Sequence, residues 1–174
     1  MKKQKGFSLI ELLIVVAIIL IIAAIAIPNL MRARMAANEA SAVGSVRTIT
    51  TGEISYQAAN WYAGAVPVGF SVKLNDIGAN GGACGANPPG APTSTQTCLI
   101  DDVLAKAQTP ATAKSGYYFV YTPVATGGVN VGFAVSGEPA QPGQTGNRYF
   151  FGDQSGVIRA NPSAKATVTD NAIQ

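Results

Sequence analysis

Sixteen consecutive apolar residues, at positions 12–27, set the first limit on how this chain can fold. Extended to residues 7–30, the stretch is 24 residues long, and as a helix it would measure about 36 Å against a membrane hydrocarbon core of about 30 Å. The segment is therefore long enough to span a membrane. Three lysines and no acid lie in the first six positions, which predicts a cytoplasmic N-terminus with the rest of the chain outside.

A secreted protein with an ordinary signal peptide is the alternative, since Ala24-Ile25-Ala26 looks like a small-residue cleavage site. However, the apolar stretch exceeds the roughly 7–15 residues of such a signal, and Glu11 lies near its start. A carboxylate within a membrane helix costs about 2.5–3.5 kcal/mol on insertion scales, which predicts a functional role and a partner. A structural interpretation also exists, in which Glu11 lies near the helix end and reaches the lipid headgroups.

The residues around Glu11 form a longer motif. Positions 5–19 read KGFSLIELLIVVAII, and AAIAIPNL follows at positions 23–30. This segment resembles the N-terminus of type IV prepilins and type II secretion pseudopilins, and its short leader followed by Phe is similar to the type IVa group. The resemblance implies that residues 1–6 are a leader, which a prepilin peptidase removes by cutting between Gly6 and Phe7. The same enzyme would methylate the new amine of Phe7.

In such a family, copies of the chain form a helical filament by packing helix to helix. The Glu11 carboxylate of one copy can then neutralise the Phe7 amine of a neighbour displaced by about one turn. An unpaired charge in that apolar setting costs several kcal/mol, so the pair would select one axial register. Pro28 removes a helical hydrogen bond, which predicts a kink or a locally melted stretch, and the resemblance implies that this segment loosens in the filament.

Residues 31–63 have the periodicity of an amphipathic helix, so that one helix would run from residue 7 to about residue 62. One face and its flanking stripe are predicted to pack against a sheet; they carry Val43, Val46, Ile49, Thr50, Ile54, Tyr56 and Trp61. The other faces carry Arg32, Arg34, Asn38, Glu39, Arg47 and Glu53. Such a rod cannot be buried in a chain of 174 residues, so its first half is expected in a bilayer or among copies of itself.

Residues 64–116 form a Gly- and Pro-rich connection that contains Cys84, Cys98 and a short helical candidate at 100–106. Two cysteines outside the cytoplasm favour a disulfide, and closing a loop of about 15 residues contributes about 3 kcal/mol; free thiols or a metal pair are the alternatives. Asp101 and Asp102 are adjacent and therefore suit a helix N-terminus better than an acid–base pair.

Residues 117–160 are predicted to form three or four antiparallel strands, at 117–122, 129–136, 148–151 and 157–159. With the long helix this is an α+β protein, and it matches the pilin fold that the resemblance implies. Asp153 and Ser155 lie in a turn that either touches a cation or is an ordinary turn. Residues 161–174 are polar, without periodicity, and are predicted to be a flexible tail.

The sequence contains no histidine, which excludes catalysis by Ser-His-Asp or Cys-His systems, and we expect neither an enzyme nor a cofactor. The resemblance implies a structural subunit of a type IV pilus, serving adhesion, twitching motility or a related surface function. The alternative is a pseudopilin or minor pilin of a type II secretion or DNA-uptake system. Implied partners are further copies of the chain, the prepilin peptidase and N-methyltransferase, an inner-membrane assembly platform with its ATPase, and an outer-membrane secretin.

The precursor would lie in the inner membrane and the assembled form in an extracellular pilus or a periplasmic pseudopilus. Removing the leader with its three lysines leaves nine basic against nine acidic side chains. A neutral subunit can stack in many copies without accumulating charge, and it predicts no specific nucleic-acid partner.

Overall fold

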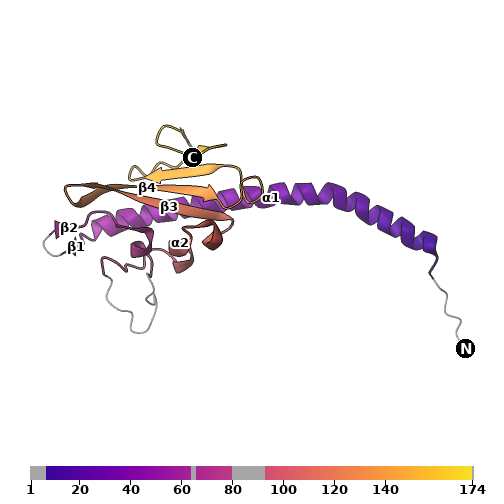
Figure 1. Ribbon diagram of the computed structural model, residues 1–174, viewed down its shortest axis with the longest axis horizontal. Helices are drawn as coiled ribbons and strands as arrows, with labels where there is room; N and C mark the ends of the chain where they lie inside the picture. The colour runs from indigo at the N-terminus through magenta and orange to yellow at the C-terminus, as the bar shows by residue number, and fades with distance from the viewer. Residues whose placement is uncertain (1–6, 64–65, 80–92, 174) are drawn as a thin grey trace, which may run out of the picture. The chain divides into compact units, whose positions relative to one another are not determined.

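The computed structural model describes residues 7–63, 66–79 and 93–173 (Figure 1). The chain has two compact units, Met1–Arg34 and Met35–Gln174, and each is described by itself. Helix α1, Leu9–Ala58, contributes to both units, and it lies within the range predicted from the sequence. The α+β fold class is confirmed, because this long helix is followed by a five-stranded antiparallel sheet.

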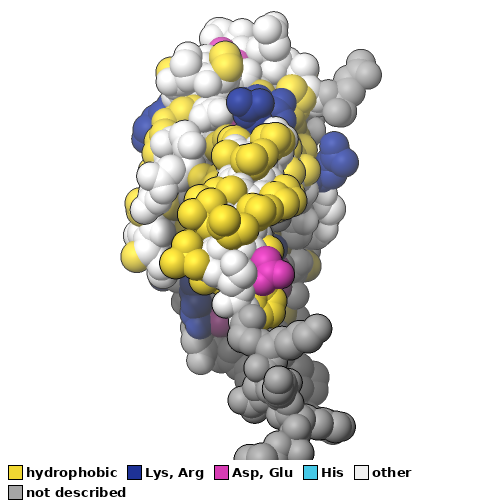
Figure 2. Space-filling view, turned by 90° about the vertical axis from the view of Figure 1, so that its right-hand side faces the viewer, with side chains coloured by type: hydrophobic (Ala, Val, Ile, Leu, Met, Phe, Trp, Pro, Cys, Tyr) yellow, Lys and Arg dark blue, Asp and Glu magenta, His cyan; other side chains and the backbone are white. Residues whose placement is uncertain are grey.

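In the first unit, no described part of the chain covers the large apolar side chains of α1. Every large apolar side chain from Leu9 to Leu30 is at least 47% exposed, and Figure 2 shows hydrophobic side chains gathered over this end of the molecule. An 18-residue window of the helix has a mean hydropathy of 3.3, so its length and composition suffice to cross a membrane. The helix is continuous through Pro28, so the local melting that the sequence allowed does not occur in the single chain.

The second unit contains the sheet and the remaining short elements. The sheet follows the chain order β3-β4-β5-β6-β7, and every neighbouring pair is antiparallel. Its strands are β3 Tyr117–Thr126, β4 Val129–Pro139, β5 Tyr149–Asp153, β6 Arg159–Asn161 and β7 Asn171–Ala172. The other elements are the hairpin strands β1 Tyr62–Ala63 and β2 Val66–Pro67, the 3-10 helices η1 Leu74–Ile77 and η2 Pro110–Thr112, and the α-helix α2 Asp102–Lys106.

The sheet packs on the later turns of α1, and two glycines determine how closely. Val46 of α1 is fully buried, and its methyl groups face Gly137 of β4 and Gly152 of β5. A Cβ added at Gly152 would lie 2.8 Å from Val46 Cγ1, and one added at Gly137 would lie 3.4 Å from Val46 Cγ2. Because neither strand has a side chain at these points, the helix backbone can approach the sheet and close the core.

The burial of α1 partly differs from the predicted faces. Val46, Ile49, Thr50 and Tyr56 are buried as predicted, whereas Ile54 is 45% exposed. Glu39 and Glu53, which the sequence assigned to other faces, are 9% and 0% exposed. The cause is that α1 is covered on more than the predicted face: the segment before β5 contacts Glu39, and the Gly- and Pro-rich connection contacts Glu53. The connection contributes these buried side chains to the common core: Phe70, Leu74, Ile77, Ile100, Leu104, Ala105 and Ala107.

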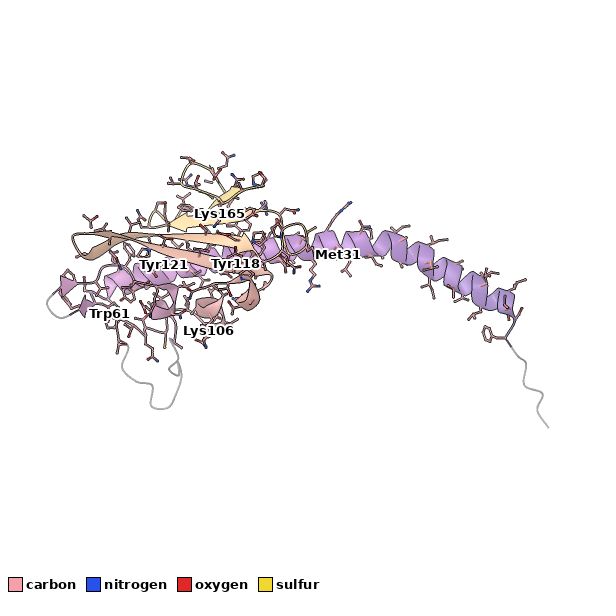
Figure 3. All side chains as sticks on the ribbon, viewed as in Figure 1. Met31, Trp61, Lys106, Tyr118, Tyr121 and Lys165 are labelled. Carbon is pink, nitrogen blue, oxygen red and sulfur yellow. The ribbon has the colours of Figure 1, made fainter. Side chains whose placement is uncertain are left out.

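The C-terminal segment contributes to the sheet. The sequence predicts a flexible tail from residue 161, whereas Asn171–Ala172 forms strand β7 beside β6. This pairing raises the strand count to five, above the three or four predicted. Lys165, labelled in Figure 3, lies in the loop between these strands, and its Nζ is 2.8 Å from Oε1 of Glu138 in β4. A strand of two residues shows no periodicity, so its pairing is not visible in the sequence.

Candidate functional site

The predicted assembly segment lies at the start of α1. Phe7 is 84% exposed and precedes the helix, and Gly6 lies outside the described residues. The backbone N–H of Ser8 donates a hydrogen bond of 2.9 Å to Oε2 of Glu11, three residues later. Glu11 therefore caps the first turn of its own helix, where a negative charge also favours the helix dipole.

Glu11 remains available to a second donor. It is exposed, and it is the only charged side chain in residues 7–31. An ionised carboxylate has about four acceptor positions, so it can accept a bond from another chain while it keeps the bond from Ser8. Leu9, Leu12, Leu13 and Val16 line a shallow apolar depression of about 280 Å³ on the adjacent turns. The site thus combines one carboxylate with an uncovered apolar surface.

The other residues singled out in the sequence lie apart from this segment. Asp101 accepts a 2.8 Å hydrogen bond from the backbone N–H of Leu104 and caps α2, which confirms its role at a helix N-terminus. Asp153 accepts a 2.9 Å bond from the backbone N–H of Ser155, an arrangement typical of an ordinary turn. Within the described residues, no group of three or more Asp, Glu, Cys or His side chains is placed to hold a metal ion.

Cys98 is exposed, with φ at 56°, and its backbone N–H donates to the carbonyl of Gly78. Its predicted partner, Cys84, lies outside the described residues. The Cys84–Cys98 disulfide therefore stays a prediction.

Sequence reasoning missed the role of Glu39, which joins α1 to the segment before β5. Its Oε2 is 2.8 Å from Arg148 Nε, and its Oε1 accepts a 2.9 Å bond from the backbone N–H of Asn147. The Arg148 guanidinium also lies 5.5 Å from the centre of the Phe150 ring. Burial raises the pKa of Glu39, but the hydrogen bonds from Asn147 and Arg148 outweigh it, and the net pKa is lowered. Its spacing from the buried positions of α1 is helical, and that is the signal that could have found it.

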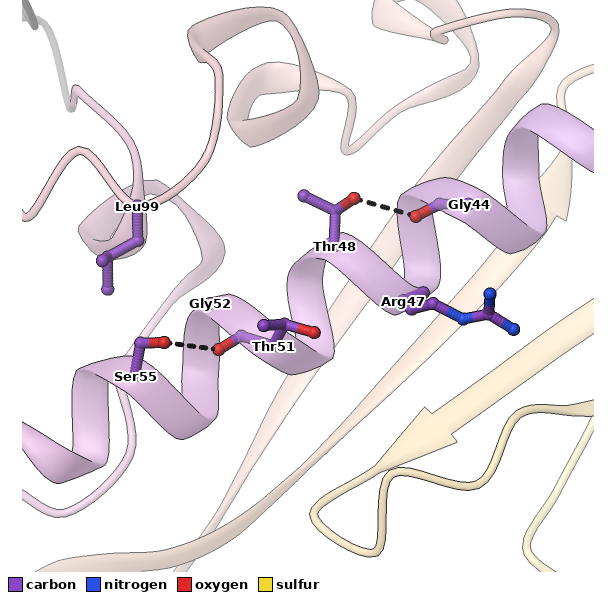
Figure 4. A pocket seen from close by; sticks show the side chains of 7 residues that line it. All are labelled: Gly44, Arg47, Thr48, Thr51, Gly52, Ser55 and Leu99. Carbon is purple, nitrogen blue, oxygen red and sulfur yellow. Dashed lines mark hydrogen bonds between the residues drawn. The ribbon is translucent and has the colours of Figure 1, made fainter.

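A groove of about 370 Å³ lies along the later turns of α1 (Figure 4). Its lining residues are Gly44, Arg47, Thr48, Thr51, Gly52, Ser55 and Leu99. The hydroxyls of Thr48 and Ser55 donate 2.9 Å bonds to the carbonyls of Gly44 and Thr51, so both are already used within the helix. None of the described residues that line the groove is an acid.

A long apolar helix whose second half packs on an antiparallel sheet is the pilin-like class of α+β fold. The prokaryotic N-terminal methylation motif matches residues 1–27 of the chain. A "type IV wide pilus major component PilA4" of Thermus thermophilus is 64% identical over 39 residues, which are 22% of this chain and 30% of that protein. The chain thus spans less than a third of this relative's length, and no solved structure matches.

The N-terminal segment thus carries a methylation motif typical of type IV pilins and pseudopilins, and it leads into a pilin-like fold.

Proposed function

We propose that this protein is a structural subunit of a type IV pilus, which polymerises through α1 into an extracellular filament. The observation that carries the proposal is the exposure of every large apolar side chain from Leu9 to Leu30, beside the single carboxylate of Glu11. A likeness to a protein named as a major pilus component supports it. The same N-terminal motif occurs in pseudopilins and minor pilins, which are the alternative.

The exposed apolar side chains in the first part of α1 explain why the subunit would polymerise. In the inner membrane, lipid covers the apolar side chains of residues 9–30. Each large apolar side chain left in water costs about 1.5–3 kcal/mol, so the helix can leave the bilayer only when another apolar surface replaces the lipid. The matching helices of further copies supply that surface.

Processing would precede assembly. A prepilin peptidase and N-methyltransferase removes residues 1–6 and methylates Phe7, which frees a cationic amine four residues before Glu11. In the filament, the Glu11 carboxylate of one copy accepts this amine from a neighbour, which fixes the axial register. An inner-membrane platform with its ATPase drives the assembly, and a secretin lets the fibre cross the outer membrane. Outside the cytoplasm, a Cys84–Cys98 disulfide would hold the long connection closed.

Electron microscopy of cells that carry and lack the gene tests the proposal. Loss of long filaments supports a pilus subunit, and intact filaments together with a secretion or DNA-uptake defect support the alternative. Cells that produce only the Glu11→Ala or the Glu11→Gln variant test the charge pair. The Gln variant is the matched control, because its amide oxygen can still cap Ser8 N–H while the charge is lost.

We expect both Glu11 variants to be inserted and cleaved but to form few filaments. Normal filaments from Glu11→Gln would show that the carboxylate charge does not direct assembly.

A further inference from the structure

Two carboxyl groups are buried where the long connection meets α1. Glu53 of α1 is 0% exposed and Asp76 of η1 is 1% exposed. Burial and the nearby charge of Asp76 both raise the pKa of Glu53, and burial raises the pKa of Asp76. Among the described residues, no ion pair involves either carboxyl.

Glu53 holds the connection through Ser71. Its Oε2 accepts a 3.0 Å bond from the backbone N–H of Ser71, and its Oε1 accepts a 2.5 Å bond from the Ser71 hydroxyl. The carbonyl of Ser71 in turn accepts bonds from the Tyr121 hydroxyl of β3, at 3.1 Å, and from the Asn130 amide of β4, at 3.0 Å. Ser71 is thus a junction between the helix, the connection and the sheet.

Asp76 is less well satisfied. Its Oδ2 accepts a 3.2 Å bond from the backbone N–H of Lys73, while its buried Oδ1 has no hydrogen-bond partner within the described part of the chain. The carbonyl of Asp76 accepts bonds from the N–H and hydroxyl of Thr97, which ties the 93–100 segment to the same place. The backbone N–H groups of Lys73 and Val72 lower the pKa of Asp76 but do not outweigh its burial, so a negative charge on this carboxyl is poorly compensated.

The other titratable groups here do not neutralise two negative charges. Tyr56 and Tyr121 face Glu53, and burial raises the pKa of both phenols, for Tyr56 to about 12, so they remain uncharged at ordinary pH. Lys73 is an exposed cation whose field lowers the pKa of Asp76 only in part. A metal ion fits poorly, because no third Asp, Glu, Cys or His side chain of the described residues is placed to bind it together with these two carboxyls.

We propose that Glu53 and Asp76 form a proton-dependent clasp between α1 and the connection. With a proton bound to the pair, residues 71–79 and 93–100 stay packed against the helix. When rising pH removes that proton, the buried negative charge weakens this packing, and the two segments open more often. The direction follows from linkage. An acid that binds its proton more tightly in the folded state contributes stability below its unfolded pKa, and this contribution is lost as pH rises toward the folded value. The clasp concerns the folded subunit, so its failure would leave the proposed pilus role untouched.

Hydrogen exchange of the full chain in detergent micelles tests the clasp, read by mass spectrometry on peptides from residues 66–79 and 93–100. After correction for intrinsic exchange rates, the open population of the wild type should rise by up to about tenfold per pH unit as pH increases above the ordinary carboxyl pKa. Asp76→Asn and Glu53→Gln remove the ionisable group with little change in shape, and each should flatten this dependence. Glu39→Gln is the matched control, because Glu39 is a buried acid of the same helix with an opposite pKa shift, and it should leave the rise unchanged.

Two results would overturn the clasp. The first is an unchanged pH dependence in Asp76→Asn, a variant that does not disturb the Ser71 bonds to Glu53. The second is protection of the wild type at high pH by added Ca²⁺, reversed by a chelator, which would assign the two carboxyls to a cation instead of a proton.

Discussion

Gly152→Ala tests how closely α1 lies on the sheet. The added methyl group would lie 2.8 Å from Val46 Cγ1 and 3.1 Å from Thr50 Oγ1, distances at which the surrounding atoms must move. Both neighbours are buried side chains of α1, so little free space can absorb the shift. The backbone of Gly152 lies outside the left-handed region, so the effect is one of packing and not of backbone strain.

The magnitude follows from overpacking. Adding a methyl group to a well-packed core typically destabilises a protein by about 1–3 kcal/mol. For a chain of this size, that lowers the midpoint of thermal unfolding by about 2–4 °C per kcal/mol. Val46→Ala alone removes two methyl groups, at about 0.8 kcal/mol each before any cavity is counted. In the double variant the new methyl occupies space that Val46 vacated, so it should be less destabilised than the sum of the single variants by at least about 0.5 kcal/mol.

Urea unfolding of the full chain in detergent micelles, followed by the fluorescence of Trp61, measures these values. Trp61 is half-buried and its ring lies 6.1 Å from that of Tyr56, so it reports on the core of the sheet-bearing unit. The matched control is Gly44→Ala, an exposed helix position with no atom within 4 Å of the added Cβ. This control should be stabilised by about 0.5–1 kcal/mol, since alanine favours a helix over glycine. An unfolding free energy of Gly152→Ala equal to that of the wild type, or additive effects in the double variant, would refute the close approach.

Two further predictions concern the links that hold the sheet-bearing unit together. The lowered pKa of Glu39 means that its contribution to stability is present above its unfolded pKa and is lost as pH falls through the folded value. Acid unfolding monitored by Trp61 fluorescence should therefore be less steep in Glu39→Gln, and an identical profile would contradict the role given to Arg148. Reduction of the predicted Cys84–Cys98 disulfide should destabilise the chain by about 3 kcal/mol, measured by urea unfolding with and without reductant. Free thiols in the unreduced protein, detected by alkylation, would exclude that bond.

The long helix and the fold class were predictable because their signals are local. An apolar run of membrane length and an alternating pattern after residue 117 each specify their element without knowledge of its neighbours. Strands β3, β4 and β5 follow the predicted positions, with the turn at Gly127 and Gly128. The capping role of Asp101 was predictable for the same reason.

The partners of the helix were less visible in the sequence. Glu53 lies on the helical repeat that also buries Ile49 and Tyr56. However, burial of its carboxyl group depends on hydrogen bonds from Ser71, a residue of the irregular connection. The apolar residues of that connection have no period, because they enter the core singly between glycines and prolines. Strand β7 depends on the end of the chain returning to β6, a contact that no short window of sequence contains.

Mass spectrometry of filaments sheared from the cell surface tests the central claim most directly. If the chain is a pilus subunit that assembles through α1, purified filaments contain it with Phe7 as the first residue and one methyl group on its amine. Filaments that lack this chain, or that contain it with residues 1–6 still attached, would contradict the account.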